Sequence, residues 1–166
     1  GELLARGPAV AAAAARAADW AAFATAALSL GTGFALVERT AAYVRQRTQF
    51  GRPIGSFQAV KHRLADALIG LEFARPLLYG AAVALASGPT GGALASGSTG
   101  DVRAEVAAAK VATGEAAYTA ARTALQLHGA LGYTDEYELS LWIRKARALR
   151  SAWGSPSVCR ARVLAP

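Results

Sequence analysis

The sequence predicts an all-α protein, an up-and-down bundle of four helices. Hydrophobic residues fill 54% of the 166 positions, with Ala dominant, whereas aromatic residues account for only 8%. Small side chains of high helix propensity suit closely packed helices, while a β-sandwich would need more Val, Tyr and Thr. Apolar residues also recur at three- and four-residue steps between the turn signals. A chain of this length can bury a sizeable core, so we expect one domain over residues 1–166.

The first half of the chain predicts two long helices. The first extends from Pro8, a residue suited to a first helical turn, to about Arg47. Ser56 can cap the second helix, in which apolar residues recur with helical spacing. Pro76 lies far inside this second run, where we expect it to kink the helix rather than end it.

The second half predicts a loop followed by two more helices. Residues 87–101 consist mostly of Gly, Ser and Thr, and we expect a flexible loop there. The third helix runs from about Asp101, a capping residue, to Gly129, which supplies a natural stop. The fourth helix spans about residues 136–152 and ends at the sequence WGSPS, residues 153–157.

Charge and cysteine content restrict the function. The formal net charge is +7 and comes mainly from Arg, whose planar guanidinium suits phosphates and carboxylates. The arginines are scattered, without a basic run or a zinc or RNA-recognition motif, so we do not expect nucleic-acid binding. Cys159 is the only cysteine, which excludes an internal disulfide, and the two histidines give no metal-ligand spacing. These features favour a cytoplasmic protein without a metal.

One uncharged stretch is long enough to span a membrane. WAAFATAALSLGTGFALV, residues 20–37, carries no charge over 18 positions. Much of it is weakly apolar Ala, Thr, Ser or Gly, and Asp19 and Glu38 bound it without a basic flank. We therefore expect a helix buried in the bundle and no membrane span. Gly31 and Gly33 give it a small-residue patch that a neighbouring backbone can approach closely.

RTQFGRPIGSFQ, residues 47–58, interrupts the helical pattern with residues that can bind a ligand. Arg47 offers five donors, Gln49 an amide and Phe50 a flat face, all at a helix end. Such a group can hold a planar, phosphorylated ligand. The same residues also fit an interhelix turn whose Phe plugs the core, and physical reasoning alone favours that second interpretation.

A family resemblance changes that balance. It is carried by YVRQRTQFGRPIGSFQAVKHRLADALIGLEFAR at 43–75 and by AAAKVATGEAAYTAARTALQLHGALGYTDEYELSLWIRKAR at 107–147. Together these segments resemble the carboxy-terminal helical domain of acyl-CoA dehydrogenases, with R-x-Q-F-G, F-Q-x-V, L-A-D and Q-x-H-G-x-x-G-Y in the expected order. The resemblance covers about residues 20–155. It implies that residues 1–8 mark the junction to a β-barrel domain that is absent here, as is the family's amino-terminal helical domain.

The resemblance implies an FAD site shared between subunits. In the family, the matching residues reach the adenosine and pyrophosphate portions of a flavin held mainly by the neighbouring subunit. A cation, an amide and a ring at a helix end then face the cofactor. Ala130 stands where the family often has a glycine, and His128 is expected to be a helix-end imidazole bonded to the last carbonyls, with a secondary contact near the flavin as the alternative. The implied FAD contacts are Arg47, Gln49, Phe50, Phe57, Gln58 and Gln126.

The family's catalytic carboxylate has no counterpart at the expected position. Acyl-CoA dehydrogenases remove the α proton of the thioester with a Glu, while hydride leaves the β carbon for the flavin. The string RKARALRSAWGS places Trp153 at the usual Glu position, and Trp cannot accept that proton. The alternative family position falls near Ala21. Asp19 lies about 200° around the helix from it and is expected to be a solvated acid. Glu136 and Glu138 are further candidates, but they suit the first turn of the last helix.

Two functions remain open. In the first, the chain is the carboxy-terminal domain of an acyl-CoA dehydrogenase-like flavoprotein, an FAD-dependent oxidoreductase acting on acyl-CoA, and is inactive alone because it lacks its own base. A homo-oligomer, dimer or tetramer, or a second acyl-CoA dehydrogenase chain carrying the Glu would complete the site. In the second, the bundle mediates association and has lost flavin binding. The retained cation and two amides favour the first function, and the apolar faces predict self-association.

Overall fold

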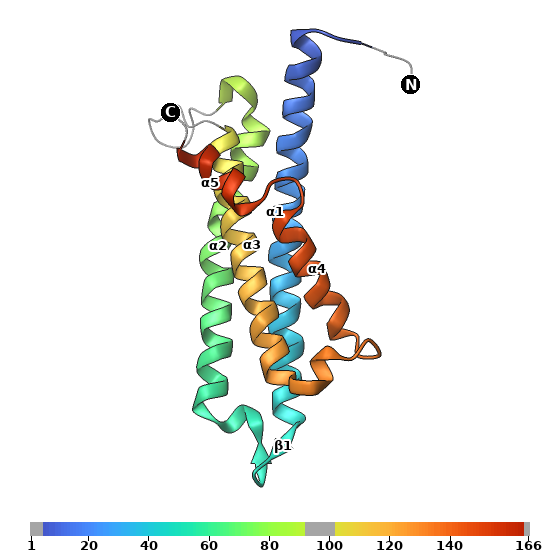
Figure 1. Cartoon of the computed structure of the whole chain (residues 1–166). Helices are drawn as coiled ribbons and strands as arrows, with labels where there is room; N and C mark the ends of the chain where they lie inside the picture. The colour runs from blue at the N-terminus through green and yellow to red at the C-terminus, as the bar shows by residue number, and fades with distance from the viewer. Residues whose placement is uncertain (1–4, 92–101, 165–166) are drawn as a thin grey trace.

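A computed structural model describes residues 5–91 and 102–164 of the protein. Three long helices, α1 (Pro8–Gln46), α2 (Gln58–Gly91) and α3 (Val102–His128), lie side by side and run in alternating directions (Figure 1). Helix α4 (Leu139–Ser151) packs against α1 and α3, and the short helix α5 (Pro156–Leu164) packs against α3. The predicted all-α, up-and-down bundle is confirmed. Helix α5 is an element that the sequence analysis did not predict.

Two short connections lie at the same end of the bundle (Figure 1). The first is a two-stranded antiparallel hairpin, β1 (Thr48–Gln49) and β2 (Arg52–Pro53), followed by the 3₁₀ turn η1 (Ile54–Ser56). The second is the 3₁₀ turn η2 (Gly129–Tyr133), which leads from α3 towards α4. The bundle therefore brings residues near 50 and residues near 130 to one end.

Helix α2 differs from its expected bounds at both ends. It begins at Gln58, and the Ser56 hydroxyl donates a 2.7 Å hydrogen bond to the Pro53 carbonyl instead of capping the helix. The helix continues through Pro76, as expected, and extends to Gly91. It therefore includes the first part of the segment expected to be a flexible loop, and residues 92–101 of that segment lie outside the described residues.

Alanine and glycine let the long helices pack closely. The main core cluster contains Ala residues from α1, α2, α3 and α4 together with fully buried Leu36 and Leu71. A Cβ added to Gly33 would clash with the Leu71 side chain and lie 3.2 Å from the Cα of Ala117. The expected small-residue contact is therefore confirmed at Gly33, whereas a Cβ at Gly31 would meet open space.

Several polar side chains inside the bundle have partners. The hydroxyls of Ser29, Thr40 and Thr113 each donate to the backbone carbonyl four residues earlier. Asp19 is buried, and its carboxylate pairs with the guanidinium of Arg103 at 3.4 Å. The expectation of a solvated acid at Asp19 is wrong, because Asp19 lies only three residues before Ala22, where α1 packs against α2 and α3 in a buried cluster.

Two helices are long and apolar enough, by length and composition, to cross a membrane. The segments Pro8–Gln46 and Gln58–Ser87 have mean hydropathies of 1.6 and 1.4 over their most apolar windows, of which 44% and 28% are buried. Core helices of bundles meet the same criterion. The lower burial in α2 reflects exposed apolar side chains, which we call the apolar face of α2. Its members are Leu68, Ile69, Phe73, Leu77, Tyr79 and Val83.

Candidate functional site

The hairpin after α1 reverses the chain within two residues. Gln49 pairs with Arg52, and the residues between them, Phe50 and Gly51, have φ angles of 55° and 77°. Two consecutive positive φ angles match the twist of a two-stranded ribbon. Glycine adopts this conformation readily, but a bulky side chain in it is strained. The turn therefore holds Phe50 in a conformation that backbone preference opposes.

The aromatic side chains of this hairpin end lie at the surface. Phe50 is 90% exposed and meets the ring of Phe57 edge-on, with the ring centroids 6.1 Å apart. The guanidinium of Arg52 lies 4.1 Å from the Phe57 centroid, a cation–π contact. The interpretation that Phe50 plugs the core is wrong, because its ring projects from the end of the bundle. Arg52 is a residue that the sequence analysis did not single out.

The other predicted contact residues lie at the same end of the molecule. Arg47 follows the last turn of α1, and the Ile54 amide donates a 2.8 Å hydrogen bond to its carbonyl. Gln49 and Gln58 are both exposed at the hairpin end. Gln126 lies in the last turn of α3, which ends at the hairpin end of the bundle (Figure 1). The fold thus brings all six predicted residues to one end.

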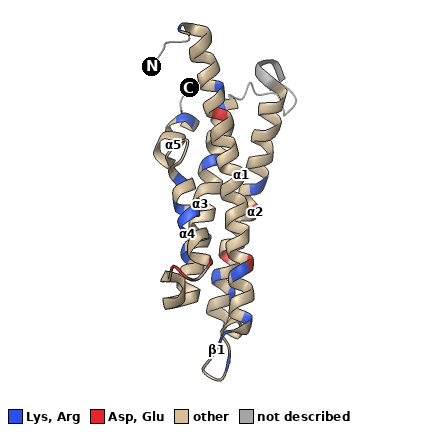
Figure 2. Cartoon of the chain, turned by 90° about the vertical axis from the view of Figure 1, so that its right-hand side faces the viewer, with Lys and Arg blue, Asp and Glu red and all other residues tan. Residues whose placement is uncertain are grey.

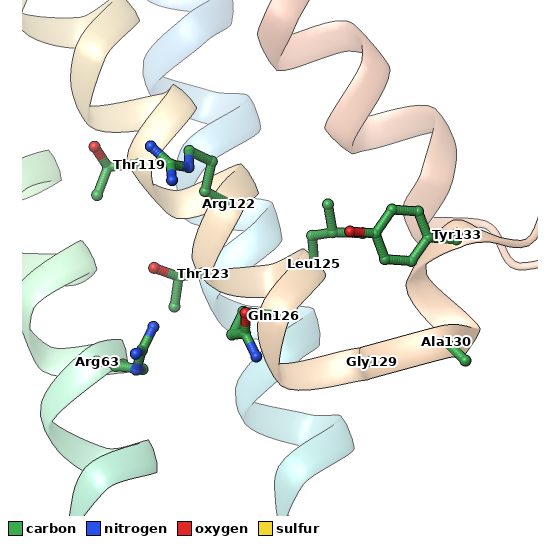
Figure 3. A pocket seen from close by; sticks show the side chains of 9 residues that line it. All are labelled: Arg63, Thr119, Arg122, Thr123, Leu125, Gln126, Gly129, Ala130 and Tyr133. Atoms are coloured by element: carbon green, nitrogen blue, oxygen red, sulfur yellow. The ribbon is translucent and has the colours of Figure 1, made fainter.

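Gln126 lines a pocket of about 610 Å³ between α2, α3 and η2 (Figure 3). Among its lining residues, the sequence analysis predicted a ligand contact only for Gln126, and it named Gly129 and Ala130 for the helix end and the turn. Positions 119, 122, 123 and 126 recur with the spacing of one helix face, and this polar stripe on an Ala-rich helix could have indicated the pocket. The polar side chains that line it are Arg63, Thr119, Arg122, Thr123, Gln126 and Tyr133.

His128 is buried in the last turn of α3. Its Nδ1 lies 2.8 Å from the Ala124 carbonyl oxygen, to which this nitrogen donates. The ring stacks on Tyr43 with centroids 4.1 Å apart and lies 5.5 Å from the ring of Tyr137. Burial lowers the pKa of the imidazole below its usual 6.5, and the bond to Ala124 partly offsets this. The expected helix-end imidazole bonded to a carbonyl is confirmed.

Trp153 lies in the turn between α4 and α5. Its φ is 55°, and the indole is 63% exposed. Gly154 follows with φ of 136°, and a Cβ there would lie 2.7 Å from the buried Sγ of Cys159. The indole therefore sits on a sharply turned backbone that is held by α5.

The candidate carboxylates have other roles or lie apart from the pocket. Glu138 precedes α4, pairs with Arg39 at 2.9 Å and accepts a 3.3 Å hydrogen bond from the Trp142 indole. Glu136 is exposed in the segment before α4. No carboxylate is among the residues that line the pocket around Gln126. Within the two described ranges, no three His, Cys, Asp or Glu side chains group together as a metal site.

Comparison with known proteins identifies the family. The acyl-CoA dehydrogenase C-terminal domain matches residues 11–165. The chain belongs to the acyl-CoA dehydrogenase family. It is 36% identical to acyl-CoA dehydrogenase IpdE2 of Mycobacterium tuberculosis over 139 aligned residues. The aligned region covers 84% of this chain and 39% of that protein. It is 34% identical to glutaryl-CoA dehydrogenase of Desulfococcus multivorans over 131 residues, 79% of this chain and 31% of that protein. The chain therefore spans less than two fifths of either relative.

Solved acyl-CoA dehydrogenase structures share the fold. A glutaryl-CoA dehydrogenase bound to glutaryl-CoA superimposes with a TM-score of 0.78 at 30% identity, covering 89% of this chain and 35% of that chain. The ChsE4–ChsE5 complex of Mycobacterium tuberculosis gives 0.76 at 29% identity, covering 90% of this chain and 39% of that chain. The predicted acyl-CoA dehydrogenase family and fold are thus confirmed.

Within this acyl-CoA dehydrogenase domain, two of the residues considered as substitutes for the usual Glu are engaged elsewhere, and Glu136 is exposed before α4. Asp19 is buried against Arg103, and Glu138 is paired with Arg39. Each of these two carboxylates is therefore paired with a cation of this chain. The assignment of Trp153 to the Glu position of acyl-CoA dehydrogenases stays a prediction.

Proposed function

We propose that this domain belongs to a flavin-dependent acyl-CoA dehydrogenase and supplies the hairpin edge of an FAD site shared with a neighbouring subunit. The observation that carries the proposal is Phe50, a strained ring that is 90% exposed at the hairpin tip. Backbone strain tends to persist at ligand-binding sites, where another interaction offsets it. A ring with little burial of its own gains most when a ligand or a partner covers it.

The residues at the hairpin end fit the chemistry of FAD. Arg47 is exposed and has no ion pair within the described part of the chain, so its guanidinium is available to a phosphate. Gln49 and Gln126 offer amides to the polar edges of a ribose or base, and Phe50 offers a flat face. When bound, FAD supplies the hydride acceptor for dehydrogenation of an acyl-CoA thioester. This chain's own residues bind and orient the cofactor.

We assign the proton-abstracting carboxylate to another chain. An indole at position 153 has no lone pair for the α proton, and Asp19 and Glu138 are already ion-paired. The base then comes from a second acyl-CoA dehydrogenase chain in a mixed assembly, while a homo-oligomer would share the FAD site without this base. The ChsE4–ChsE5 structure, a complex of two different chains, supports the mixed arrangement by analogy.

The apolar face of α2 supports association with another chain, either a second copy of this one or a different acyl-CoA dehydrogenase chain. Phe73 is 76% exposed and Tyr79 62%, on a helix that is otherwise a bundle element. Contiguous apolar surface of this sort marks contact with another molecule. Association without flavin is the second candidate function, since this face alone favours it. That alternative leaves the strained Phe50 without a role, so we rank the FAD edge first.

We place the protein in the cytoplasm, because Cys159 is a free thiol.

The test is the intact mass and visible absorption spectrum of the protein purified from its native source. A mass above 17.0 kDa together with co-purifying flavin supports the proposal, since the cofactor's remaining contacts would belong to the other domains. A colourless 17.0 kDa protein that stays colourless with added FAD and with a candidate partner chain contradicts it and favours the association module. Arg47→Gln should reduce flavin retention, whereas Arg45→Gln, the same change at an exposed position two residues earlier on α1, should not.

A further inference from the structure

We propose that His128 is a positioning residue for the FAD edge, and that its neutral imidazole holds the hairpin in place relative to Gln126. This inference rests on the proposed function and names a residue that regulates the same site. His128 is 4% exposed, so it acts through the residues packed around it rather than by contact with the cofactor. Protonation of the imidazole then loosens the edge and releases flavin.

The ring of His128 connects the end of α1 with the end of α3. His128 is the last residue of α3, two positions after Gln126, and its ring stacks on Tyr43 with 21° between the two planes. The Tyr43 carbonyl accepts a 2.9 Å hydrogen bond from the amide of Arg47. The Arg47 carbonyl in turn accepts one of 2.8 Å from the amide of Ile54, on the far side of the hairpin. A single stack therefore links both ends of the hairpin to the helical turn that carries Gln126.

Two further elements pack against His128. The ring of Tyr137, in the segment before α4, is tilted by 46° at a centroid distance of 5.5 Å. A Cβ added at Gly132 of η2 would lie 3.3 Å from the His128 Cβ, so the backbone of η2 passes directly against this side chain. The end of α1, η2 and the segment before α4 thus share one ring as a spacer. In a closely packed interior, displacement of that ring changes the distances between them.

The surroundings of the imidazole favour its neutral form. Because Nδ1 donates to the Ala124 carbonyl, the neutral ring carries its lone pair on Nε2. Nε2 is buried and has no hydrogen-bond partner in the part of the chain that the structure describes. A proton there would place a charged N–H in the interior without an acceptor. Burial accordingly lowers the pKa of His128.

The groups that face His128 offer the charged ring no ion pair. Tyr43 from α1 and Tyr137 from the segment before α4 are phenols, and η2 contributes a glycine. An aromatic face attracts a cation, but it does not replace the missing acceptor at Nε2. A protonated His128 is therefore more stable outside the stack, in contact with water, and the end of α1 then loses its spacer. The acids of the segment before α4 (Figure 2) are exposed Glu136, Asp135, which pairs with Arg144 at 3.1 Å, and Glu138, which pairs with Arg39 at 2.9 Å.

The first test is hydrogen exchange of the Arg47 and Ile54 amides, followed by NMR in the 166-residue chain at stepwise pH values. Protection of these amides, relative to that of the buried Leu71 amide, should decrease as pH falls below 6.5. The decrease should reach up to about tenfold per pH unit until the lowered pKa of the folded state is passed, because only the opened form takes up the proton in that window. His128→Phe keeps a ring in the stack and should abolish this pH dependence, whereas exposed His62→Phe should preserve it.

The second test is flavin retention by the flavin-bearing protein, purified from its native host with the same variants in place. The wild type and His62→Phe should lose flavin progressively as pH falls below 6.5. His128→Phe should lose less flavin than the wild type in that range. His128→Ala leaves no ring against Tyr43 and should retain less flavin than the wild type at every pH. Circular dichroism shows that the variants compared are folded.

The outcomes distinguish this inference from the proposed FAD edge. An acid-side decrease in protection that is equal in His128→Phe and the wild type overturns the role of His128, even where Arg47→Gln loses flavin. Protection of the Arg47 and Ile54 amides that does not change with pH overturns it as well. Flavin retained in full by Arg47→Gln overturns the FAD edge, while the exchange measurement still decides whether His128 holds the hairpin.

Discussion

The ammonium group of Lys110, a residue buried in the first half of α3, donates a 2.9 Å hydrogen bond to the backbone carbonyl of Leu149 near the end of α4. It donates a second, of 3.1 Å, to the carbonyl of Arg150. The last carbonyls of a helix have no partner within it, so this lysine acts as a cap supplied by another helix. The contact fixes the end of α4 immediately before the turn that carries Trp153.

Lys110→Met should therefore destabilise the protein by about 1–3 kcal/mol, the cost of leaving buried carbonyls without donors. Lys145→Met, on the exposed side of α4, is the matched control and should change stability by less than about 0.5 kcal/mol. Urea unfolding followed by circular dichroism measures both. Equal stability of the two variants would show that the buried cap contributes nothing.

The same lysine predicts a rise in stability at alkaline pH. Burial lowers its pKa below the usual 10.5, and the charge of Cys159 partly offsets this. Between the lowered pKa and 10.5, the unfolded chain keeps a proton that the folded chain has released, so stability increases with pH. The gap in unfolding midpoint between the wild type and Lys110→Met should widen as pH rises through this window. A gap that narrows would contradict the sign of the shift.

His128 predicts a loss of stability on the acid side. Its pKa is lowered by burial, so as pH falls from 6.5 the unfolded chain takes up a proton before the folded chain does. The stability contribution is therefore present above pH 6.5 and is lost as pH falls through the lowered pKa of the folded state. His128→Phe, which keeps a ring between Tyr43 and Tyr137, should flatten this dependence, and exposed His62→Phe should not. Unfolding midpoints at stepwise pH values distinguish the two.

The sequence was sufficient for the helices because their signals are local. Pro8 and Gly129 mark helix ends through backbone preference, and the structure ends α1 and α3 within about a residue or two of the expected bounds. Contacts between helices were not accessible in this way. The pairing of Asp19 with Arg103, and the pocket that residues of both α2 and α3 line, depend on the relative rotation of separate helices, which spacing along one helix does not determine.

The positive φ angle of Phe50 predicts that substitutions at this position increase the stability of the chain. Phe50→Asn should stabilise the chain by about 1 kcal/mol, since asparagine tolerates a positive φ far better than phenylalanine. Phe50→Ala removes the same exposed ring but keeps an unfavourable residue in the turn, so it should gain less. Urea unfolding of the three proteins tests the order. An asparagine variant no more stable than the alanine variant would show that the turn is not strained.

The apolar face of α2 predicts an effect on assembly. Phe73→Glu places a charge on a side chain that is 76% exposed, so the isolated fold should retain its helicity while association weakens by tenfold or more. Leu28→Glu, at a 55% exposed position on α1, is the matched control for an apolar-to-acid change outside this face. Analytical ultracentrifugation over a concentration series measures the self-association of both variants. Identical sedimentation of both variants and the wild type would remove α2 from the interface.

Two neighbouring glycines on α1 should respond to alanine in opposite directions. A Cβ at Gly31 meets open space, so Gly31→Ala should stabilise the helix by about 0.5–1 kcal/mol through the lower entropy of the unfolded chain. A Cβ at Gly33 would clash with Leu71 and press on the backbone of Ala117, and the backbone cannot yield as a flexible side chain can. Gly33→Ala should therefore destabilise by about 1–3 kcal/mol. Thermal unfolding of both variants compares them directly, and the same sign for both would mean that α1, α2 and α3 do not approach one another as closely as the bundle requires.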